Sequence, residues 1–206
     1  MAPLLLLSVL ATAPPVCVQP AAPMVVPADT LRGIYESGVP FAEFLDKANR
    51  RRDQWVRNAE LAANPDPALV ARLRALGGTW RLLAVAPDGC SDSVHTTVWM
   101  AGLEAAGDNV ELRVVTVERG QGVMDAHPTQ DGRSATPTVV LLDADWRERG
   151  CFIERPRALR LLLEDVPSGE RFERKMSWYE DDAGRETLAD LVAMLEAAAG
   201  GGVRCE

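Results

Sequence analysis

The chain has 206 residues, a length that favours one domain with a tail. Hydrophobic residues make up 47% of it and charged residues 25%, so there is enough apolar material for a globular core. The formal net charge of −8 argues against a nucleic-acid-binding protein, because binding to phosphates requires a cationic surface. The local basic run, Arg50-Arg51-Arg52, is expected to lie on the solvated face of a helix.

Four cysteines and two histidines are spread along the sequence. The cysteines, Cys17, Cys90, Cys151 and Cys205, form no C-x-x-C pair, so we expect no metal site and no cofactor. Their wide spacing does not define a disulfide framework and leaves the redox compartment open. One further hypothesis pairs Cys17 with Cys205, or each with another chain, after export.

The first residues share some features with an export signal. Residues 4–10 form an apolar run that is followed by small residues and prolines. However, no Lys or Arg precedes the run, and Pro14 is unfavourable directly after the small triplet Ala11-Thr12-Ala13. The run is shorter than the roughly 20 residues that span a bilayer, so no membrane span is predicted. Residues 1–30 are interpreted as a signal-like or disordered leader, and the location stays open between the cytoplasm and export to the periplasm.

Hydrophobic periodicity, glycines and prolines predict helices packed around a small sheet. Helices are expected at residues 41–62, 68–76, 91–106, 157–163, 169–179 and 186–199, with a short helical or irregular crossover at 121–130. Strands are expected at residues 80–85, 110–117, 138–142 and 151–154, the last two as a hairpin. The pattern predicts an α/β domain over residues 31–199 with a central mixed sheet. Gly200-Gly201-Gly202 ends the last helix and opens a flexible tail over residues 200–206.

Two short stretches organise the chain. Cys90 follows the predicted strand 80–85 and directly precedes the helix that begins at Ser91. Further on, Thr136-Pro137 lies directly before strand 138–142. A cysteine at a helix start, with a later Thr-Pro step at a strand start, resembles the skeleton of the thioredoxin fold.

The resemblance extends to a bacterial family of thioredoxin-like proteins, over roughly residues 40–199. Members of that family carry a Trp-Cys-Gly-Asp-Ala-like loop, a Gly-Gly-Arg-Ser-Ile-Pro-like segment, an Arg-Pro step after the fourth strand and a Trp-Tyr-x-x-Asp-x-Gly-like stretch. The counterparts here are Gly89-Cys90-Ser91-Asp92-Ser93, Asp131-Gly132-Arg133-Ser134-Ala135-Thr136-Pro137, Arg155-Pro156 and Trp178-Tyr179-Glu180-Asp181-Asp182-Ala183-Gly184. The resemblance implies a thioredoxin-like fold with extra helices at both the N-terminal and the C-terminal end.

Cys90 is the predicted reactive residue. A thiol reacts as its thiolate, which a helix N-terminus stabilises because backbone N–H groups point at the sulfur. Ser93 lies on the same face of the first turn, so its hydroxyl is expected to reach the sulfur. The carboxylates of Asp88 and Asp92 act in the opposite direction. The sequence therefore leaves the thiolate population open.

The residues that would face Cys90 come from the hairpin. The resemblance makes Pro137 the cis proline of the fold and gives Thr136 the role of pairing with an extended substrate. Arg155 ends the returning strand and is expected near Cys90, where it would stabilise the thiolate or hold an anionic substrate group. The same pairing puts Cys151 about 13 Å from Arg155, at roughly 3.3 Å per residue. Cys151 is therefore expected to be a half-buried strand residue and no partner for Cys90.

The histidines and the late aromatic pair are given structural or surface roles. His95 lies five residues after Cys90, about 140° around a helix, so it is expected to face away from the sulfur and to be exposed. His127 is expected at the surface of a crossover. Trp178 and Tyr179 are expected to pack the closing helices.

The absence of a second cysteine limits the chemistry. A dithiol reductase releases its mixed disulfide by attack of a second thiol, and Ser93 stands at that position here. Cys90 is therefore predicted to carry out monothiol thiol–disulfide exchange resolved by an outside thiol such as glutathione, or to sense peroxides or disulfides. Its partners would be proteins or low-molecular-weight thiols and disulfides. The alternative is a non-catalytic thioredoxin-fold binding module without redox turnover, and the substrate, reductant and oligomeric state do not follow from the sequence.

Overall fold

The computed structural model describes residues 25–205. The apolar run at residues 4–10 and Cys17 lie outside the described residues. The helices are α1 (Ala28–Glu36), α2 (Phe41–Lys47), α3 (Arg52–Ala62), α4 (Pro67–Arg74), α5 (Ser91–Ala106), α6 (Val117–Ala126), α7 (Arg157–Glu164), α8 (Arg171–Asp182) and α9 (Arg185–Ala199). The strands are β1 (Trp80–Val85), β2 (Val110–Val115), β3 (Thr138–Leu142), β4 (Glu148–Ile153) and β5 (Arg204–Cys205).

The strands form one mixed sheet in the order β2-β1-β3-β4-β5. β1 pairs parallel with β2 and antiparallel with β3, β3 pairs antiparallel with β4, and β5 pairs parallel with β4. Helix α5 connects the parallel pair β1 and β2, as parallel neighbours require a crossover. Side chains are buried along nearly all of β1 and the whole of β3, which explains why both strands are mostly apolar. This arrangement confirms the predicted α/β fold class.

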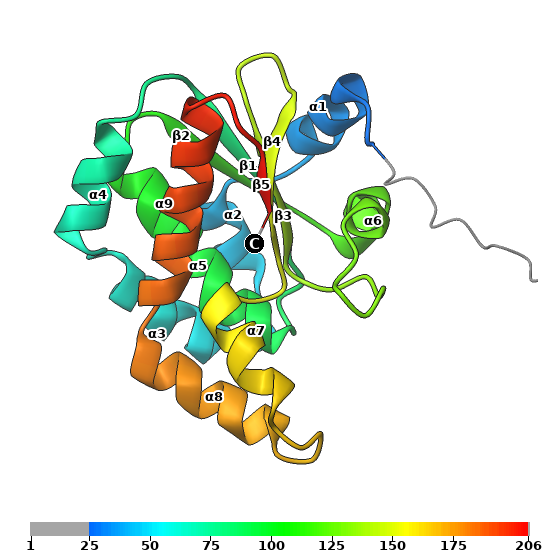
Figure 1. The fold of residues 1–206 in the computed structure, drawn as a ribbon, viewed down its shortest axis with the longest axis vertical. Helices are drawn as coiled ribbons and strands as arrows, with labels where there is room; N and C mark the ends of the chain where they lie inside the picture. Colours follow the sequence, from blue (N-terminus) through cyan, green and yellow to red (C-terminus); the bar gives the residue numbers. More distant parts are fainter. Residues whose placement is uncertain (1–24, 206) are drawn as a thin grey trace, which may run out of the picture.

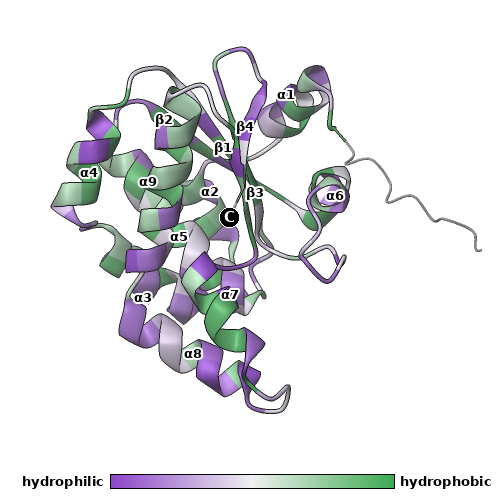
Figure 2. Ribbon diagram, in the orientation of Figure 1, coloured by the Kyte–Doolittle hydropathy of each residue, from purple (hydrophilic) through white to green (hydrophobic). Residues whose placement is uncertain are grey.

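Helices cover both faces of the sheet (Figure 1). On one face, α1 and α6 bury Tyr35 and Val123 against the strands. On the other face, α3, α5 and α9 contribute Trp55, Leu103 and Leu191 to a larger cluster. A small third cluster joins α7 to α8. Figure 2 shows α3 and α8 as largely hydrophilic, in agreement with helices that each bury only one side.

The single helix predicted over residues 41–62 is wrong, because α2 and α3 are separate helices. Arg51, at the start of α3, has a left-handed φ of 54°. In the break, the amides of Asn49 and Arg50 donate to the carboxylate of Asp88 over 3.1 and 2.9 Å. A side chain distant in sequence thus accepts hydrogen bonds from the backbone between the two helices. The basic run is therefore not a continuous solvated helix face.

The prediction of a flexible tail over residues 200–206 is wrong for Arg204 and Cys205, which form β5. Cys205 forms a disulfide with Cys151 across a sequence separation of 54. Strands β4 and β5 approach closely at Gly150, where an added Cβ atom would lie 2.5 Å from the carbonyl oxygen of Arg204. The missing side chain at Gly150 lets β5 pair with β4. Cys151 is also not half-buried, since only 1% of it is exposed.

Two other sequence-based interpretations change with these contacts. The hypothesis that Cys205 pairs with Cys17 is contradicted, because the partner of Cys205 is Cys151. At the other end, α1 begins inside the predicted leader of residues 1–30, and its Leu31 is buried in the core. Within residues 25–205, no helix is long and apolar enough to cross a membrane. The same residues contain no group of three or more His, Cys, Asp and Glu side chains that could hold a metal ion.

Candidate functional site

Cys90 lies where β1 gives way to α5, at the N-cap position of that helix. Its Sγ accepts a hydrogen bond from the backbone N–H of Ser93 over 3.4 Å. The thiol also donates to the carbonyl oxygen of Thr136 over 3.1 Å, and the Thr136–Pro137 peptide bond is cis. Cys90 is half-buried and is the free cysteine of the described residues. The helix start and the loop before β3 therefore meet at this sulfur.

Ser93 contacts the sulfur through its backbone and not through its hydroxyl. The Ser93 side chain is fully buried, and its Oγ has no hydrogen-bond partner among the described residues. The expected hydrogen bond from the Ser93 hydroxyl to Cys90 is therefore not formed. What stabilises negative charge on the sulfur in this geometry is the amide of the first turn of α5.

Arg155 pairs with Asp92 in the first turn of α5, and not with Cys90. Its Nε is 3.4 Å from Oδ1 of Asp92, and its terminal nitrogen is 2.5 Å from Oε1 of Glu154. The Arg155 side chain is 17% exposed. Arg155 therefore lies at the end of the sheet where it was predicted, but its guanidinium group is paired with the carboxylates of Asp92 and Glu154.

Asp92 is the centre of a buried polar cluster that sequence reasoning missed. Lys175 Nζ lies 2.6 Å from its Oδ2, and the Tyr179 hydroxyl donates to its Oδ1 over 2.9 Å. Lys175 also donates to the Ser91 hydroxyl over 2.9 Å. Burial, followed by the neighbouring Asp92 carboxylate, raises the pKa of Tyr179 well above its usual value, so the phenol stays protonated. Tyr179 is therefore a hydrogen-bond donor to the site as well as a packing group.

The cluster continues from Arg155 to the loop before the cis proline. Glu154 accepts from Arg133 over 2.8 Å as well as pairing with Arg155. The backbone N–H of Glu154 donates to the carbonyl oxygen of Pro137 over 2.7 Å, and Glu154 adopts a left-handed φ of 66°. A chain of alternating charges, Lys175, Asp92, Arg155, Glu154 and Arg133, thus links α8, the start of α5 and the proline loop. We define these five residues as the charge chain.

The loop before Cys90 is held from the other side by the basic run. Arg51 Nε donates to the carbonyl oxygen of Gly89 over 2.8 Å, and the Trp55 indole donates to that of Asp88 over 2.9 Å. An added Cβ atom at Gly89 would lie 3.0 Å from the guanidinium group of Arg50. Arg50 therefore covers the position where the similar family has a tryptophan. The spacing of the basic run gives no sign of this contact, which depends on the break between α2 and α3.

Both histidines were predicted to lie at the surface, and neither is exposed. His95 stacks on Tyr179 with ring centroids 4.6 Å apart, and its Nδ1 lies 3.2 Å from the Asn58 amide nitrogen. Burial lowers the pKa of His95 to about 4, so it is neutral near pH 7. Burial also lowers the pKa of His127, but hydrogen bonds to Glu148 and to the backbone outweigh burial and raise it above its usual value. No hydrogen bond joins either ring to Cys90.

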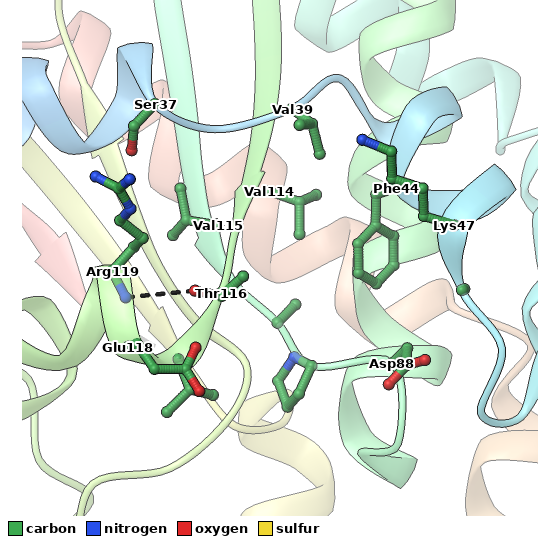
Figure 3. Close-up of a pocket in the computed structure, with 14 residues that line it drawn as sticks. Ser37, Val39, Phe44, Lys47, Asp88, Val114, Val115, Thr116, Glu118 and Arg119 are labelled. Atoms are coloured by element: carbon green, nitrogen blue, oxygen red, sulfur yellow. Dashed lines mark hydrogen bonds between the residues drawn. The ribbon is translucent and has the colours of Figure 1, made fainter.

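A groove of about 480 Å³ opens next to the Cys90 loop (Figure 3). Apolar and charged side chains line it together, including Val39, Phe44, Lys47, Asp88, Val114, Glu118 and Arg119. Figure 3 shows the Phe44 ring and the valines between the charged groups. The groove reaches Asp88, whereas Cys90 does not line it. A ligand in this groove would contact the loop and not the sulfur.

Comparison with known proteins identifies the family and the fold. A family model described as thioredoxin matches residues 38–167. The crystal structure of an HIV epitope scaffold is similar, with a TM-score of 0.65 and 22% identity, covering 81% of this chain and 97% of that chain. A crystal structure of a protein of unknown function from Pseudomonas aeruginosa has a TM-score of 0.62 and 24% identity, covering 80% and 96% of the two chains. At these identities the structural likeness shows the fold alone, and a search of curated proteins found no match.

Proposed function

Because this chain belongs to the thioredoxin family, we propose that it carries out monothiol thiol–disulfide exchange through Cys90. One observation carries the proposal: the half-buried Sγ of Cys90 lies between the first-turn amide of α5 and the carbonyl oxygen before a cis proline. The amide stabilises negative charge on the sulfur, whereas the hydrogen bond from the thiol to the carbonyl oxygen opposes ionisation and holds the sulfur beside the cis proline. Partial exposure leaves the sulfur accessible to a disulfide.

The reaction has two exchange steps. In the first, the Cys90 thiolate attacks one sulfur of a substrate disulfide, a new S–S bond forms, and the other substrate sulfur leaves as a thiolate. In the second, an outside thiol attacks the substrate sulfur of this mixed disulfide and releases Cys90 as a thiolate. The outside thiol is required because Ser93 has no sulfur, and Cys151 is already paired with Cys205. The register supports this assignment, since Cys151 pairs with Val140 further along β3 from the proline loop.

The remaining candidate residues would position the substrate. Thr136 and Pro137 form the loop beside the sulfur, and an extended substrate chain would pair with the Thr136 backbone as an added strand. Arg155 acts through Asp92 and Glu154, to which it is paired, so its proposed role is to position the helix start and the proline loop. Thiol exchange requires no metal or other cofactor in this proposal.

Alkylation and trapping test this function together. At a pH near 6, we expect iodoacetamide to label Cys90 faster than free cysteine, because the first-turn amide of α5 points at the sulfur and stabilises negative charge on it. Incubation with glutathione disulfide should give one glutathione adduct on Cys90, and added glutathione should remove it. Cys90→Ser should abolish both signals without changing the unfolding transition.

The competing function is a thioredoxin-fold binding module without redox turnover. It predicts labelling no faster than that of free cysteine and no glutathione adduct on Cys90. Such a result would overturn the exchange proposal while leaving the family and the fold intact.

A further inference from the structure

The two sulfurs of the Cys151–Cys205 disulfide lie in different surroundings. Cys151 is buried in the sheet and 1% exposed. Cys205 is exposed at the sheet edge. A thiolate that attacks a disulfide must reach one sulfur and displace the other. Only Cys205 is accessible for this attack, so Cys151 would be the leaving group.

Cys205 also lines a cavity of about 510 Å³. The cavity lies between the loop before β3, the end of β4, α7 and the first residue of α8. Four of its lining residues are arginines and three are acids: Arg133, Arg155, Arg160 and Arg171, with Asp131, Glu154 and Glu164. An excess of arginine is notable in a chain whose formal net charge is −8. We call this cavity the arginine pocket.

The arginines of this pocket differ in how fully they are paired. Arg133 and Arg155 both pair with Glu154, as part of the charge chain. Arg171 donates through Nε to the backbone carbonyl of Val166 over 2.8 Å and through a terminal nitrogen to that of Glu164 over 3.5 Å, so it orders the loop before α8 without pairing with a carboxylate and keeps its other N–H groups for a ligand. Among the described residues, neither Arg160 nor Arg171 has a carboxylate oxygen within 4.0 Å.

These two guanidinium groups are suited to an anionic ligand. Arginine binds carboxylates through two parallel N–H donors, which fixes both position and orientation. Glu164 lines the same pocket and reduces the local positive potential, and Arg171 contacts its backbone carbonyl, not its carboxylate. A small ligand with a carboxylate would therefore find two cationic groups in the cavity that also contains Cys205.

We propose that the arginine pocket binds a low-molecular-weight thiol that carries carboxylates, and that this thiol exchanges with the disulfide at Cys205. The ligand thiolate forms a bond to the Cys205 sulfur, the Cys151–Cys205 bond breaks, and Cys151 leaves as a thiolate that takes up a proton. A second ligand thiol then attacks the ligand sulfur of the adduct, which yields the ligand disulfide and a Cys205 thiol. This chemistry does not involve Cys90 and is independent of the function proposed for it.

Exchange at Cys205 would also loosen β5. Only two register pairs join β5 to β4, Gly150 with Arg204 and Cys151 with Cys205. The disulfide is the covalent link across this short pairing. Its opening is expected to raise amide hydrogen exchange along the adjoining part of β4.

The test uses the full chain with Cys90→Ser, so that Cys205 is the site of attack under study. The rate of adduct formation is measured by mass spectrometry with glutathione and with uncharged 2-mercaptoethanol, at equal thiolate concentrations. We expect glutathione to react faster by about five- to tenfold, and high salt to reduce this preference because screening weakens charge attraction. Peptide mapping should locate the adduct on Cys205.

Arg160→Gln/Arg171→Gln is the decisive variant, and Arg57→Gln on α3 is the matched control, since Arg57 is an exposed arginine outside the pocket. The double variant should react with both thiols at similar rates, while the control keeps the preference for glutathione. If the double variant unfolds, Arg160→Gln alone should lower the preference by about half. An unchanged preference, an adduct on Cys151, or a purified protein without the Cys151–Cys205 disulfide each overturns the proposal.

Discussion

Replacing Lys175 by methionine tests whether the buried charges at the start of α5 stabilise the fold. Lys175 Nζ is 2.6 Å from Asp92 Oδ2, and the two side chains are 10% and 7% exposed. Methionine keeps much of the apolar part of the lysine side chain and removes the charge. The Asp92 carboxylate then retains the Tyr179 hydroxyl and the Arg155 guanidinium group.

The expected cost follows from the charge that remains. Removing one partner of a buried ion pair lowers the free energy of unfolding by about 3–5 kcal/mol, because the other charge stays in a poorly solvated position. Asp92 keeps two polar partners, so we expect a cost near the lower end, about 3 kcal/mol. The pair between Lys47 and Glu43 is a matched control, with the same distance of 2.6 Å but side chains 69% and 47% exposed. Lys47→Met should cost less than about 1 kcal/mol, as exposed ion pairs do.

Urea denaturation of both variants measures this difference, with the dependence on urea concentration checked for a common slope. The double variant Asp92→Asn/Lys175→Met should recover a large part of the loss, because it leaves no unpaired carboxylate. A cost for Lys175→Met that equals the cost for Lys47→Met would refute the reasoning. It would mean that water reaches Asp92 and screens its charge.

Three further predictions concern single residues. Ser93→Cys should form a disulfide with Cys90 and give turnover in an insulin reduction assay with dithiothreitol; failure to form the disulfide would show that the helix start cannot bring the two sulfurs together. Because the pKa of His127 is raised in the fold by Glu148, its contribution to stability is present below about pH 6.5 and is lost as the pH rises through the folded-state value. The stability difference between the native chain and His127→Gln should therefore shrink on going from acidic to alkaline pH, and a constant difference contradicts the assignment. Gly150→Ala should lower the free energy of unfolding by about 1–3 kcal/mol, since its Cβ would meet the β5 backbone at 2.5 Å; calorimetry with an unchanged melting temperature would contradict the close approach.

The parts of the fold that follow from local sequence were predicted well. The apolar runs of β1 and β3 match the predicted strands, and α5 begins and ends at the predicted residues. These elements are buried along their length or are bounded by strong local signals, such as Gly107 after α5. The meeting of Cys90 with the loop at Pro137 follows from the same pattern, because Val85 at the end of β1 pairs with Thr138 at the start of β3, and Cys90 and Pro137 lie in the loops next to these two residues.

The remaining features depend on contacts between distant parts of the chain. The break between α2 and α3 needs the carboxylate of Asp88, and neither segment alone contains that information. Asp92 looks in the sequence like an anion that opposes a thiolate, and only the docking of α8 brings Lys175 to it. The disulfide likewise needs β5 to reach the sheet edge, which a short segment after three glycines does not signal. Sequence periodicity reports burial, whereas these partners are selected by tertiary structure.

The charge chain also makes a prediction whose sign separates electrostatics from simple structural damage. Asp92 follows Cys90 closely and its negative charge disfavours the thiolate, while Lys175 and Arg155 favour it. Asp92→Asn should therefore increase the rate of Cys90 alkylation near pH 6 by about two- to fivefold, and Lys175→Met should decrease it by a similar factor. Both variants are expected to destabilise the fold, so general loosening of the site would move both rates in the same direction. Opposite changes in rate support control of Cys90 by the charge on α8, and parallel changes contradict it.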